Sequence, residues 1–245
     1  TRPRRFGKTL TMSMLEHFFS VRYAEHAEDF ASLSIWKDEK YRQLQGTYPV
    51  ISISFASVKE NTFSGVRKQI CQIVTDLYDR NDFLLESDCL NEREKESFRR
   101  VSPEMENYLA ANSLHALSSF LSRYYGKKVI LLLDEYDTPL QEAYVHGYWR
   151  ELVDFTRSLF NASFKTNPYL ERAIMTGITR VSRESIFSDL NNLEVVTSTS
   201  EKYETFFGFT EEEVFAALDE YGMGDSKQEV KSWYDGFTFG RQRDI

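Results

Sequence analysis

Apolar side chains return every three or four positions in several stretches of the chain, which is the spacing of one face of an α-helix. These stretches are residues 10–18, 63–78, 114–124 and 149–164. In the first stretch the apolar face consists of Leu10, Met14, Leu15 and Phe18. The third is followed by Gly126, a residue type common just after helix C-termini. The pattern therefore predicts four amphipathic helices.

Other stretches have the character of β-strands. Residues 48–55 alternate apolar side chains with serines, and residues 129–133 form an uninterrupted apolar run, which is typical of a strand buried on both faces. Residues 173–178 and 193–196 are shorter apolar segments. Strands that alternate with helices indicate a parallel sheet covered by helices on both faces, so the predicted fold class is α/β.

The remaining chain is more polar. Residues 79–106 are mostly acidic with little apolar pattern, which predicts either exposed helices or a mobile insertion. Thr210 and Glu213 have the spacing of a capping box, which predicts the start of a helix. We interpret the aromatic run at residues 233–239 as packing of a small subdomain rather than as a platform for stacking bases. The expected organisation is a core of residues 1–200 and a small, mainly helical subdomain of residues 201–245.

Composition and charge narrow the function classes. The chain has 245 residues and a formal net charge of −8, so its surface as a whole does not suit the DNA backbone, and direct nucleic-acid binding is not expected. Two cysteines and four histidines do not supply a zinc site or a disulfide framework, which favours a reducing, cytoplasmic compartment. Apolar runs such as residues 129–133 are far shorter than the about 18 residues of a membrane span. Because the chain opens at Thr1 inside a motif, we expect it to be a fragment of a longer protein.

Gly7, Lys8 and Thr9 stand immediately before the first predicted helix and form the end of a phosphate-binding loop. Such a loop points backbone N–H groups at phosphates, at the positive end of the helix dipole. A lysine at this position reaches the β- and γ-phosphates, and a Ser or Thr hydroxyl binds Mg²⁺. The complete motif has a glycine where this chain has Arg2. The alternative is that Lys8 is an ordinary lysine at a helix N-terminus.

Asp134 and Glu135 follow directly after the apolar run of residues 129–133. Phosphoryl transfer needs a carboxylate near the metal and a group that orients or deprotonates the attacking water. Asp134 has the position for the first task and Glu135 for the second. The alternative is an acidic pair that closes an ordinary buried strand. The two motifs occur in the expected order with a predicted strand between them, which favours nucleotide binding.

With these residues the chain resembles the bacterial AAA-ATPase-like family of P-loop NTPases, which is related to archaeal and STAND-type ATPases. The matching segments are TRPRRFGKTL at 1–10, YPVI at 48–51, LLDEYDTPL at 132–140, TGITRVSRESIFSDLNNL at 176–193 and WYDGFTFG at 233–240. The resemblance implies the P-loop NTPase form of the α/β fold, ATP as the nucleotide and Mg²⁺ as the metal. Members of the family often carry a PD-(D/E)XK nuclease-like domain after this region. The resemblance therefore also implies an attached effector domain beyond Ile245.

The resemblance assigns roles to the motif residues. Lys8 and Thr9 are the Walker A pair, Asp134 is the Walker B metal partner and Glu135 is the catalytic glutamate, so Thr9 and Asp134 hold the metal. Arg2 in place of the first glycine looks like the family's own variant. The strand that should precede the loop is not in the chain, so the sheet is expected to lack it.

Arg5, Phe6 and Gly7 complete the nucleotide-binding loop by the same resemblance. Arg4 and Arg5 either contact phosphates or lie in solvent, and the pattern does not decide between the two. Asp137 is expected to cap the turn that follows it and not to be catalytic.

Further candidates lie after the third predicted strand. Thr176 or Thr179 has the position of a polar sensor of the γ-phosphate, and a structural hydroxyl is the alternative. Arg180 and Arg183 are candidates for an arginine finger, in cis or from a neighbouring subunit, and ordinary salt bridges are the alternative. The candidate catalytic residues are therefore Glu135, Thr176 and Arg183.

The leading hypothesis is a Mg²⁺-dependent ATPase module of a larger bacterial protein, whose nucleotide state drives or gates an attached effector. The alternative is a STAND-like switch that binds nucleotide with little or no hydrolysis. The chain has no Asn-Lys-x-Asp segment, the usual guanine reader of GTPases, so adenine is the expected base. None of its prolines is followed by Asp, which indicates that nuclease chemistry is not in this chain. Assembly into a homo-oligomer stays open.

Overall fold

The computed structural model describes residues 1–3, 5–165, 167–178, 187, 193–234, 236 and 238–241. These residues belong to two compact units. The larger unit consists mainly of residues 9–177, and the smaller one mainly of residues 1–8 and 194–245. The domain boundary that the sequence suggests at residue 200 stays a prediction. Arg4, Thr179, Arg180 and Arg183 lie outside the described residues.

Within the described part of the larger unit, three parallel strands form a sheet in the order β1-β2-β3. The strands are β1 (Val50–Ser54), β2 (Val129–Asp134) and β3 (Leu170–Met175). Every residue of the central strand β2 is buried, as its uninterrupted apolar run predicts. The register places Ser54 beside Asp134 and Met175 beside Leu133, so the carboxyl ends of the strands meet at one edge.

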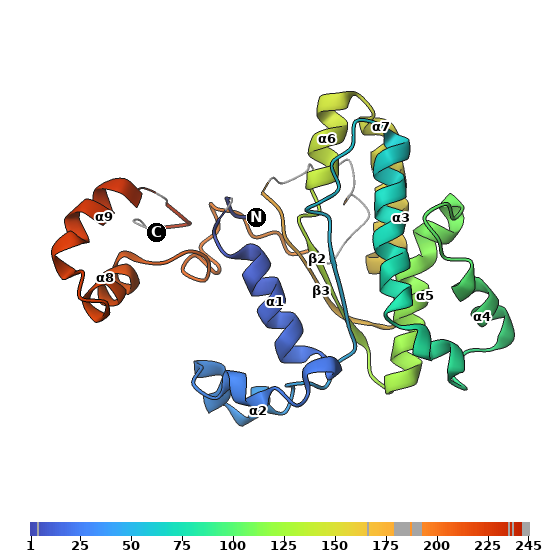
Figure 1. Ribbon diagram of the computed structural model, residues 1–245, viewed down its shortest axis with the longest axis horizontal. Coiled ribbons are helices and arrows are strands. Elements are labelled where there is room, and N and C mark those ends of the chain that lie inside the picture. The colour runs from blue at the N-terminus through green and yellow to red at the C-terminus, as the bar shows by residue number, and fades with distance from the viewer. Residues whose placement is uncertain are drawn as a thin grey trace. The chain divides into compact units, whose positions relative to one another are not determined.

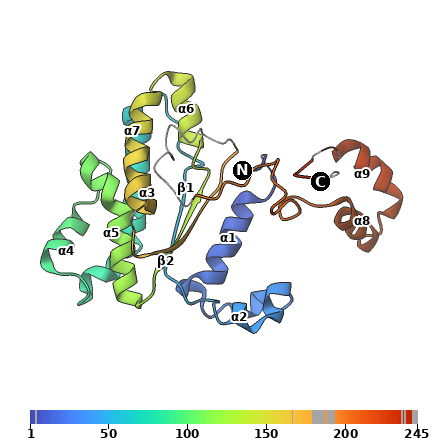
Figure 2. The same cartoon turned by 180° about the vertical axis from the view of Figure 1, so that it is seen from behind.

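Helices cover both faces of the sheet, which confirms the α/β prediction (Figure 1). On one face, α1 (Lys8–Phe19) packs through Met12 against Ile130 and Leu132. On the other face lie α3 (Phe63–Asp79), α5 (Asn107–Tyr125) and α7 (Trp149–Phe160). Figure 2 shows the same arrangement from behind. This parallel sheet between helices is consistent with a P-loop-like fold.

The apolar face of α1 differs from the predicted one. Met12 and Phe18 are buried, whereas Leu10 is 65% exposed and Met14 is 47% exposed. Successive residues of an α-helix are rotated by about 100°, so Leu10 and Met14 each lie roughly 200° from Met12. Because Met12 faces the sheet, these two side chains point away from it.

Residues 79–106 contain helices and pack against the main core, so of the two expectations for this stretch, exposed helices or a mobile insertion, the structure favours the helices. They contain the 3₁₀ helix η4 (Asp82–Glu86) and α4 (Glu92–Arg99), and the capping box of α4 is formed by Asn91 and Glu94. The few apolar side chains of this stretch join the main core, namely Leu84, Leu90, Phe98, Val101 and Met105. The pattern missed them because they are widely spaced among charged residues.

The remaining elements connect these layers. Residues 21–42 contain short helices, namely η1 (Val21–Tyr23), η2 (Ala27–Phe30), η3 (Ser34–Lys37) and α2 (Glu39–Arg42). A helix that the pattern did not predict, α6 (Thr138–His146), follows β2. The helix predicted to Phe164 consists of α7 and a π-helical turn, η5 (Asn161–Lys165).

The smaller unit contains the helices α8 (Glu211–Glu220), η7 (Gly224–Ser226) and α9 (Lys227–Tyr234). Thr210 and Glu213 form the predicted capping box of α8. The strand expected at residues 193–196 is wrong, since residues 193–197 are neither helix nor strand. A β-rich segment becomes a strand only where a neighbouring strand pairs with it, and the Val196 carbonyl instead accepts a hydrogen bond from the backbone nitrogen of Thr1 at 2.5 Å.

The aromatic run near the C-terminal end is only partly packed. Phe239 is 1% exposed, whereas Trp233 and Tyr234 in α9 are 76% and 78% exposed. Asp235 and Phe237 lie outside the described residues. The expected packing role therefore holds for Phe239 and is wrong for Trp233 and Tyr234.

Candidate functional site

Asp134 is the point at which three elements of the larger unit meet. It is the last residue of β2 and is only 4% exposed. Thr9 Oγ1, in the first turn of α1, donates a hydrogen bond to Asp134 Oδ2 at 2.7 Å. Thr176 Oγ1, directly after β3, donates to Asp134 Oδ1. One buried carboxylate thus accepts a hydroxyl at each of its oxygens.

The backbone fixes Thr176 in this position. Its N–H donates to the Leu133 carbonyl at 2.9 Å, and its own carbonyl accepts from the N–H of Tyr136 at 3.0 Å. These bonds continue the pairing of β2 and β3 by one residue past Met175. The structure therefore brings Thr9, at the start of α1, together with Asp134 and Thr176, which lie at the carboxyl ends of the neighbouring strands β2 and β3.

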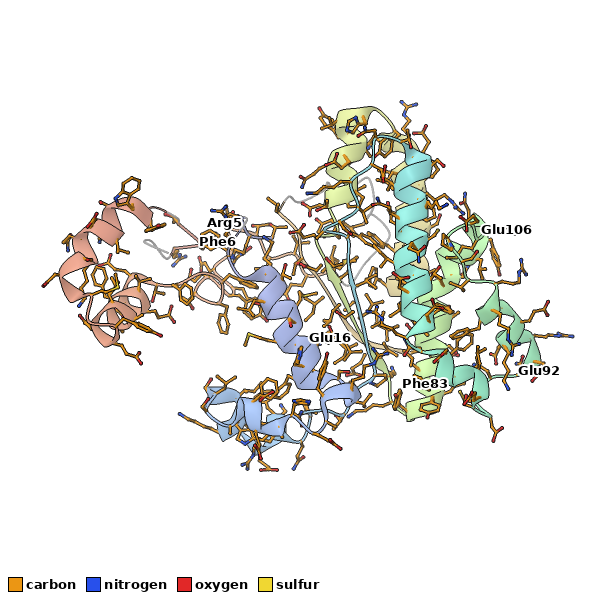
Figure 3. All side chains as sticks on the ribbon, in the orientation of Figure 1. Arg5, Phe6, Glu16, Phe83, Glu92 and Glu106 are labelled. Atoms are coloured by element: carbon orange, nitrogen blue, oxygen red, sulfur yellow. The ribbon has the colours of Figure 1, made fainter. Side chains whose placement is uncertain are left out.

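A cleft of about 370 Å³ opens beside Thr9 and Asp134. Its walls come from α1, from the last residues of β1 and from the C-terminal half of α3, and its polar lining includes Glu16, Ser54, Asp76 and Arg80. Glu16 lies in the middle of α1 (Figure 3). Sequence reasoning missed these lining residues because no local motif marks them; only the packing of α1 and α3 around β1 brings them together.

The donor set around Asp134 fits Mg²⁺. This ion prefers oxygen ligands and is usually held by one or two carboxylates together with substrate phosphates. Asp134 supplies one carboxylate and Thr9 a hydroxyl 2.7 Å away from it. Among the described residues, no group of three or more His, Cys, Asp or Glu could hold a metal by itself. A Mg²⁺ ion here would therefore be shared between the chain and its ligand.

Glu135 follows Asp134 in a left-handed backbone conformation with φ of 50°. This conformation is uncommon for a residue with a side chain, and such strain concentrates at functional sites. Glu135 is half-buried, and its Oε2 accepts a hydrogen bond from Thr138 Oγ1 at 3.1 Å. Thr138 is the first residue of α6. Sequence reasoning did not identify it as a partner of Glu135, although a hydroxyl three residues after a carboxylate is within reach of it where a helix begins.

Asp137 occupies the N-cap position of α6, as the sequence suggests, but its carboxylate does not cap the helix backbone. Asp137 Oδ2 instead accepts a hydrogen bond from Gln141 Nε2 at 2.9 Å. The carboxylate therefore contacts the next turn of α6 rather than the free N–H groups at the start of the helix.

The predicted phosphate loop belongs to the smaller unit. Arg5 and Gly7 both have φ of 69°, and Phe6 between them does not have positive φ. An alternation of this kind can direct successive N–H groups into one anion-binding concavity. Arg5 is exposed, and the ring of Phe6 packs edge-on against Phe239 at 5.1 Å. Figure 3 shows Arg5 and Phe6 just before α1.

Lys8 is the first residue of α1 and immediately precedes Thr9 in the chain. It is only 7% exposed, and its Nζ donates to the Pro3 carbonyl at 2.7 Å. Arg2, at the position of the missing glycine, is not among the residues with positive φ. The described residues of the loop with a left-handed backbone are thus Arg5 and Gly7. Arg2 has a backbone conformation that does not require glycine.

Comparisons with known proteins found sequences similar to this chain. The model of the AAA-ATPase-like family, described as predicted AAA-ATPase, matches residues 1–187. An uncharacterized protein in the vnfD 5′ region of Azotobacter chroococcum mcd 1 is 25% identical over 240 residues, which are 98% of this chain and 41% of that protein. The chain therefore spans about two fifths of the length of this relative. No solved structure shows a significant match.

Across the described residues, no helix has both the length and the apolarity that a membrane span requires.

Proposed function

The chain belongs to the AAA-ATPase-like family of predicted AAA-ATPases, and on this premise we propose that it is a Mg²⁺-dependent module that binds and hydrolyses ATP. Family membership indicates nucleotide binding. The observation that carries the proposal is the convergence of the Thr9 and Thr176 hydroxyls on the buried carboxylate of Asp134. A hydroxyl at a helix N-terminus beside a strand-end carboxylate is the arrangement that holds Mg²⁺ in P-loop NTPases.

In this proposal the residues of the loop bind the phosphates. The backbone N–H groups of residues 5–9 and the Lys8 ammonium neutralise phosphate oxygens at the positive end of the α1 dipole. Thr9 and Asp134 hold Mg²⁺, which when bound neutralises charge on the β- and γ-phosphate oxygens. Thr176 keeps the Asp134 carboxylate oriented through its hydrogen bond.

Glu135 is the proposed group that orients or deprotonates the attacking water. Its backbone is left-handed, with φ of 50°, directly after Asp134. Thr138 donates a hydrogen bond to one of its oxygens, and the second oxygen is the one that we propose accepts a proton from water. Arg183, the proposed arginine finger, lies outside the described residues and stays a prediction.

One observation favours the alternative, a nucleotide-binding switch with little or no hydrolysis. The hydrogen bond from Thr138 occupies one carboxylate oxygen of Glu135, so an approaching water has to compete for that oxygen. In either case we propose that the nucleotide state controls an effector elsewhere in the same polypeptide. The longer length of the Azotobacter relative is compatible with such an additional part. A homo-oligomer would be one way to supply an arginine finger.

The direct test is thermal unfolding of the full-length protein with and without Mg²⁺ and ATP. At ligand near 100 Kd, binding should stabilise the folded state by about 2.7 kcal/mol, which raises Tm by roughly 5–10 °C for a chain of this size. Lys8→Ala should remove the shift. Lys68→Ala is the matched control, because Lys68 is an exposed lysine paired with Glu104 on the surface. If the Tm of wild type and Lys8→Ala responds equally to ATP, the proposed site is wrong. In a separate competition assay, the adenine preference is wrong if GTP displaces labelled ATP as effectively as unlabelled ATP does.

A further inference from the structure

Arg2 is an almost fully buried cation within the smaller unit. Only 3% of its surface is exposed. Burial lowers the pKa of its guanidinium from the usual value, yet an arginine keeps its charge in proteins. A buried charge is costly unless hydrogen bonds and aromatic faces compensate for the lost water. The contacts of Arg2 therefore indicate what this residue does.

The guanidinium of Arg2 donates to the backbone carbonyls of its neighbour Thr1 and of two residues in one distant segment. Its Nη1 donates to Thr1 at 3.0 Å and to Thr197 at 2.8 Å, and its Nη2 donates to Tyr203 at 2.9 Å. The rings of Phe207 and Phe239 lie 5.4 and 4.9 Å from the guanidinium carbon. We call Arg2 and these five residues the Arg2 cluster. The cluster ties the start of the phosphate loop to residues 197–203.

The segment that receives these bonds is itself tightly held. Tyr203, whose carbonyl accepts from Arg2, has φ of 60°, an uncommon conformation for a residue with a side chain. The N–H of Gly240 donates to the Ser198 carbonyl at 2.8 Å. A Cβ at Gly240 would lie only 2.9 Å from the Ser200 carbonyl oxygen. Residues 197–203 thus keep a defined, strained shape against which Arg2 is fixed.

Lys8 is connected to the same cluster through the neighbour of Arg2. Lys8 Nζ donates to the carbonyl of Pro3, the residue directly after Arg2. A phosphate group at the loop competes with this neutral carbonyl for the ammonium, and a charge-assisted bond to phosphate is the stronger of the two. Nucleotide binding would therefore release the Pro3 carbonyl, one residue away from the hydrogen bonds of Arg2.

We propose that Arg2 is a positioning residue that couples the phosphate loop to residues 197–203, so that nucleotide binding alters the hydrogen bonding of this segment. The inference rests on the proposed nucleotide-binding function. It adds the contacts through which nucleotide binding at the loop affects another segment of the chain. Coupling is reciprocal, so any change that fixes residues 197–203 also changes nucleotide affinity.

Hydrogen exchange measured by mass spectrometry on the full-length protein tests the coupling. The probe is Mg²⁺ with a non-hydrolysable ATP analogue. In the wild type, exchange should change both at residues 5–9 and at residues 197–203 when the analogue binds. Arg2→Lys keeps the charge but loses the planar fork that reaches Thr1, Thr197 and Tyr203 at once. In this variant the loop should still respond, whereas residues 197–203 should no longer respond, and analogue affinity should fall by about 5- to 150-fold, the usual range of coupling.

A merely structural role of Arg2 predicts a different result. In that case Arg2→Lys would raise hydrogen exchange at residues 197–203 equally with and without the analogue. Exchange of the wild type at these residues would not depend on nucleotide. Lys227→Ala is the control, because Lys227 is a cation of the same unit whose partners, Asp219 and Phe215, lie outside residues 197–203. It should leave the nucleotide response unchanged.

The outcomes separate this inference from the proposed function. If the wild type binds the analogue in a manner that depends on Lys8, but residues 197–203 do not respond, the coupling is wrong and the nucleotide site stands. If no analogue binds, both are wrong. Should Arg2→Lys fail to fold, the wild-type comparison still decides, and Arg2→Gln, which keeps an amide donor without the charge, serves as the second variant.

Discussion

Thr9 Oγ1 lies 2.7 Å from Asp134 Oδ2, although 125 positions separate the two residues in the sequence. The contact joins the N-terminal turn of α1 to the carboxyl end of the central strand β2. Each residue belongs to a sequence motif that is weak by itself. Their direct hydrogen bond brings one residue of each motif together at the point where we propose a shared metal.

Asp134→Asn tests whether this point holds a metal. The substitution keeps the size of the side chain but removes the negative charge and replaces one acceptor by a donor. ATP affinity in the presence of Mg²⁺ should fall by about 10- to 100-fold, which corresponds to the loss of one bond to a charged group. Calorimetric titration with ATP, with and without Mg²⁺, measures the effect. Asp76→Asn, in the same cleft, should retain the Mg²⁺ dependence; an equal loss in both variants would point to a general charge effect.

Thr176→Val tests the second hydroxyl on Asp134. Valine has the shape of threonine but leaves one buried carboxylate oxygen without its donor. The free energy of unfolding in urea should fall by about 1.5–3 kcal/mol, the range for hydrogen bonds to charged groups. Thr176→Ser keeps the hydroxyl and should stay closer to the wild type. Equal stability of the valine and serine variants would show that the bond from Thr176 to Asp134 contributes nothing.

The sequence was sufficient for the elements that local patterns determine. The run at residues 129–133 is apolar at every position, and it became the buried strand β2. The periodicity at residues 63–78 became α3, with Val66, Ile70, Val74 and Leu77 buried. Patterns of this kind succeed because burial of one face repeats at the period of the element itself.

Contacts between distant segments could not be predicted in the same way. Arg2 and Tyr203 are 201 positions apart, and no periodic pattern links them. The exposed position of Leu10 also depends on which side of α1 meets the sheet. The approach of Thr176 to Asp134 requires knowledge that β3 pairs with β2. These features follow from tertiary packing, which a single sequence does not display.

Gly177→Ala tests how closely the segment after β3 approaches the residues after β2. A Cβ at this glycine would lie 2.5 Å from Asp137 Oδ1 and 2.9 Å from Tyr136 Cε1. Both neighbours are buried, so the added methyl group should cost about 1–3 kcal/mol of stability, as overpacking does. Gly65→Ala in α3 is the control, because there the added Cβ stays 3.1 Å from its nearest neighbours, which are all atoms of the Glu60 side chain. Urea unfolding of the two variants should show a loss for Gly177→Ala alone.

Glu135→Gln separates an ATPase from a switch. Glutamine keeps the shape of the side chain and can still accept the hydrogen bond from Thr138, but it cannot take a proton from water. If Glu135 acts as the base, phosphate release at saturating ATP should fall by roughly 10²–10⁴, the range for losing a general base. ATP affinity should change little, because the loop, Lys8, Thr9 and Asp134 are intact. Glu171→Gln, an exposed residue of β3, should leave turnover unchanged. The switch predicts a different result. The wild type would bind ATP tightly but release phosphate at the background rate, and Glu135→Gln would behave in the same way, because Glu135 would then take no proton from water.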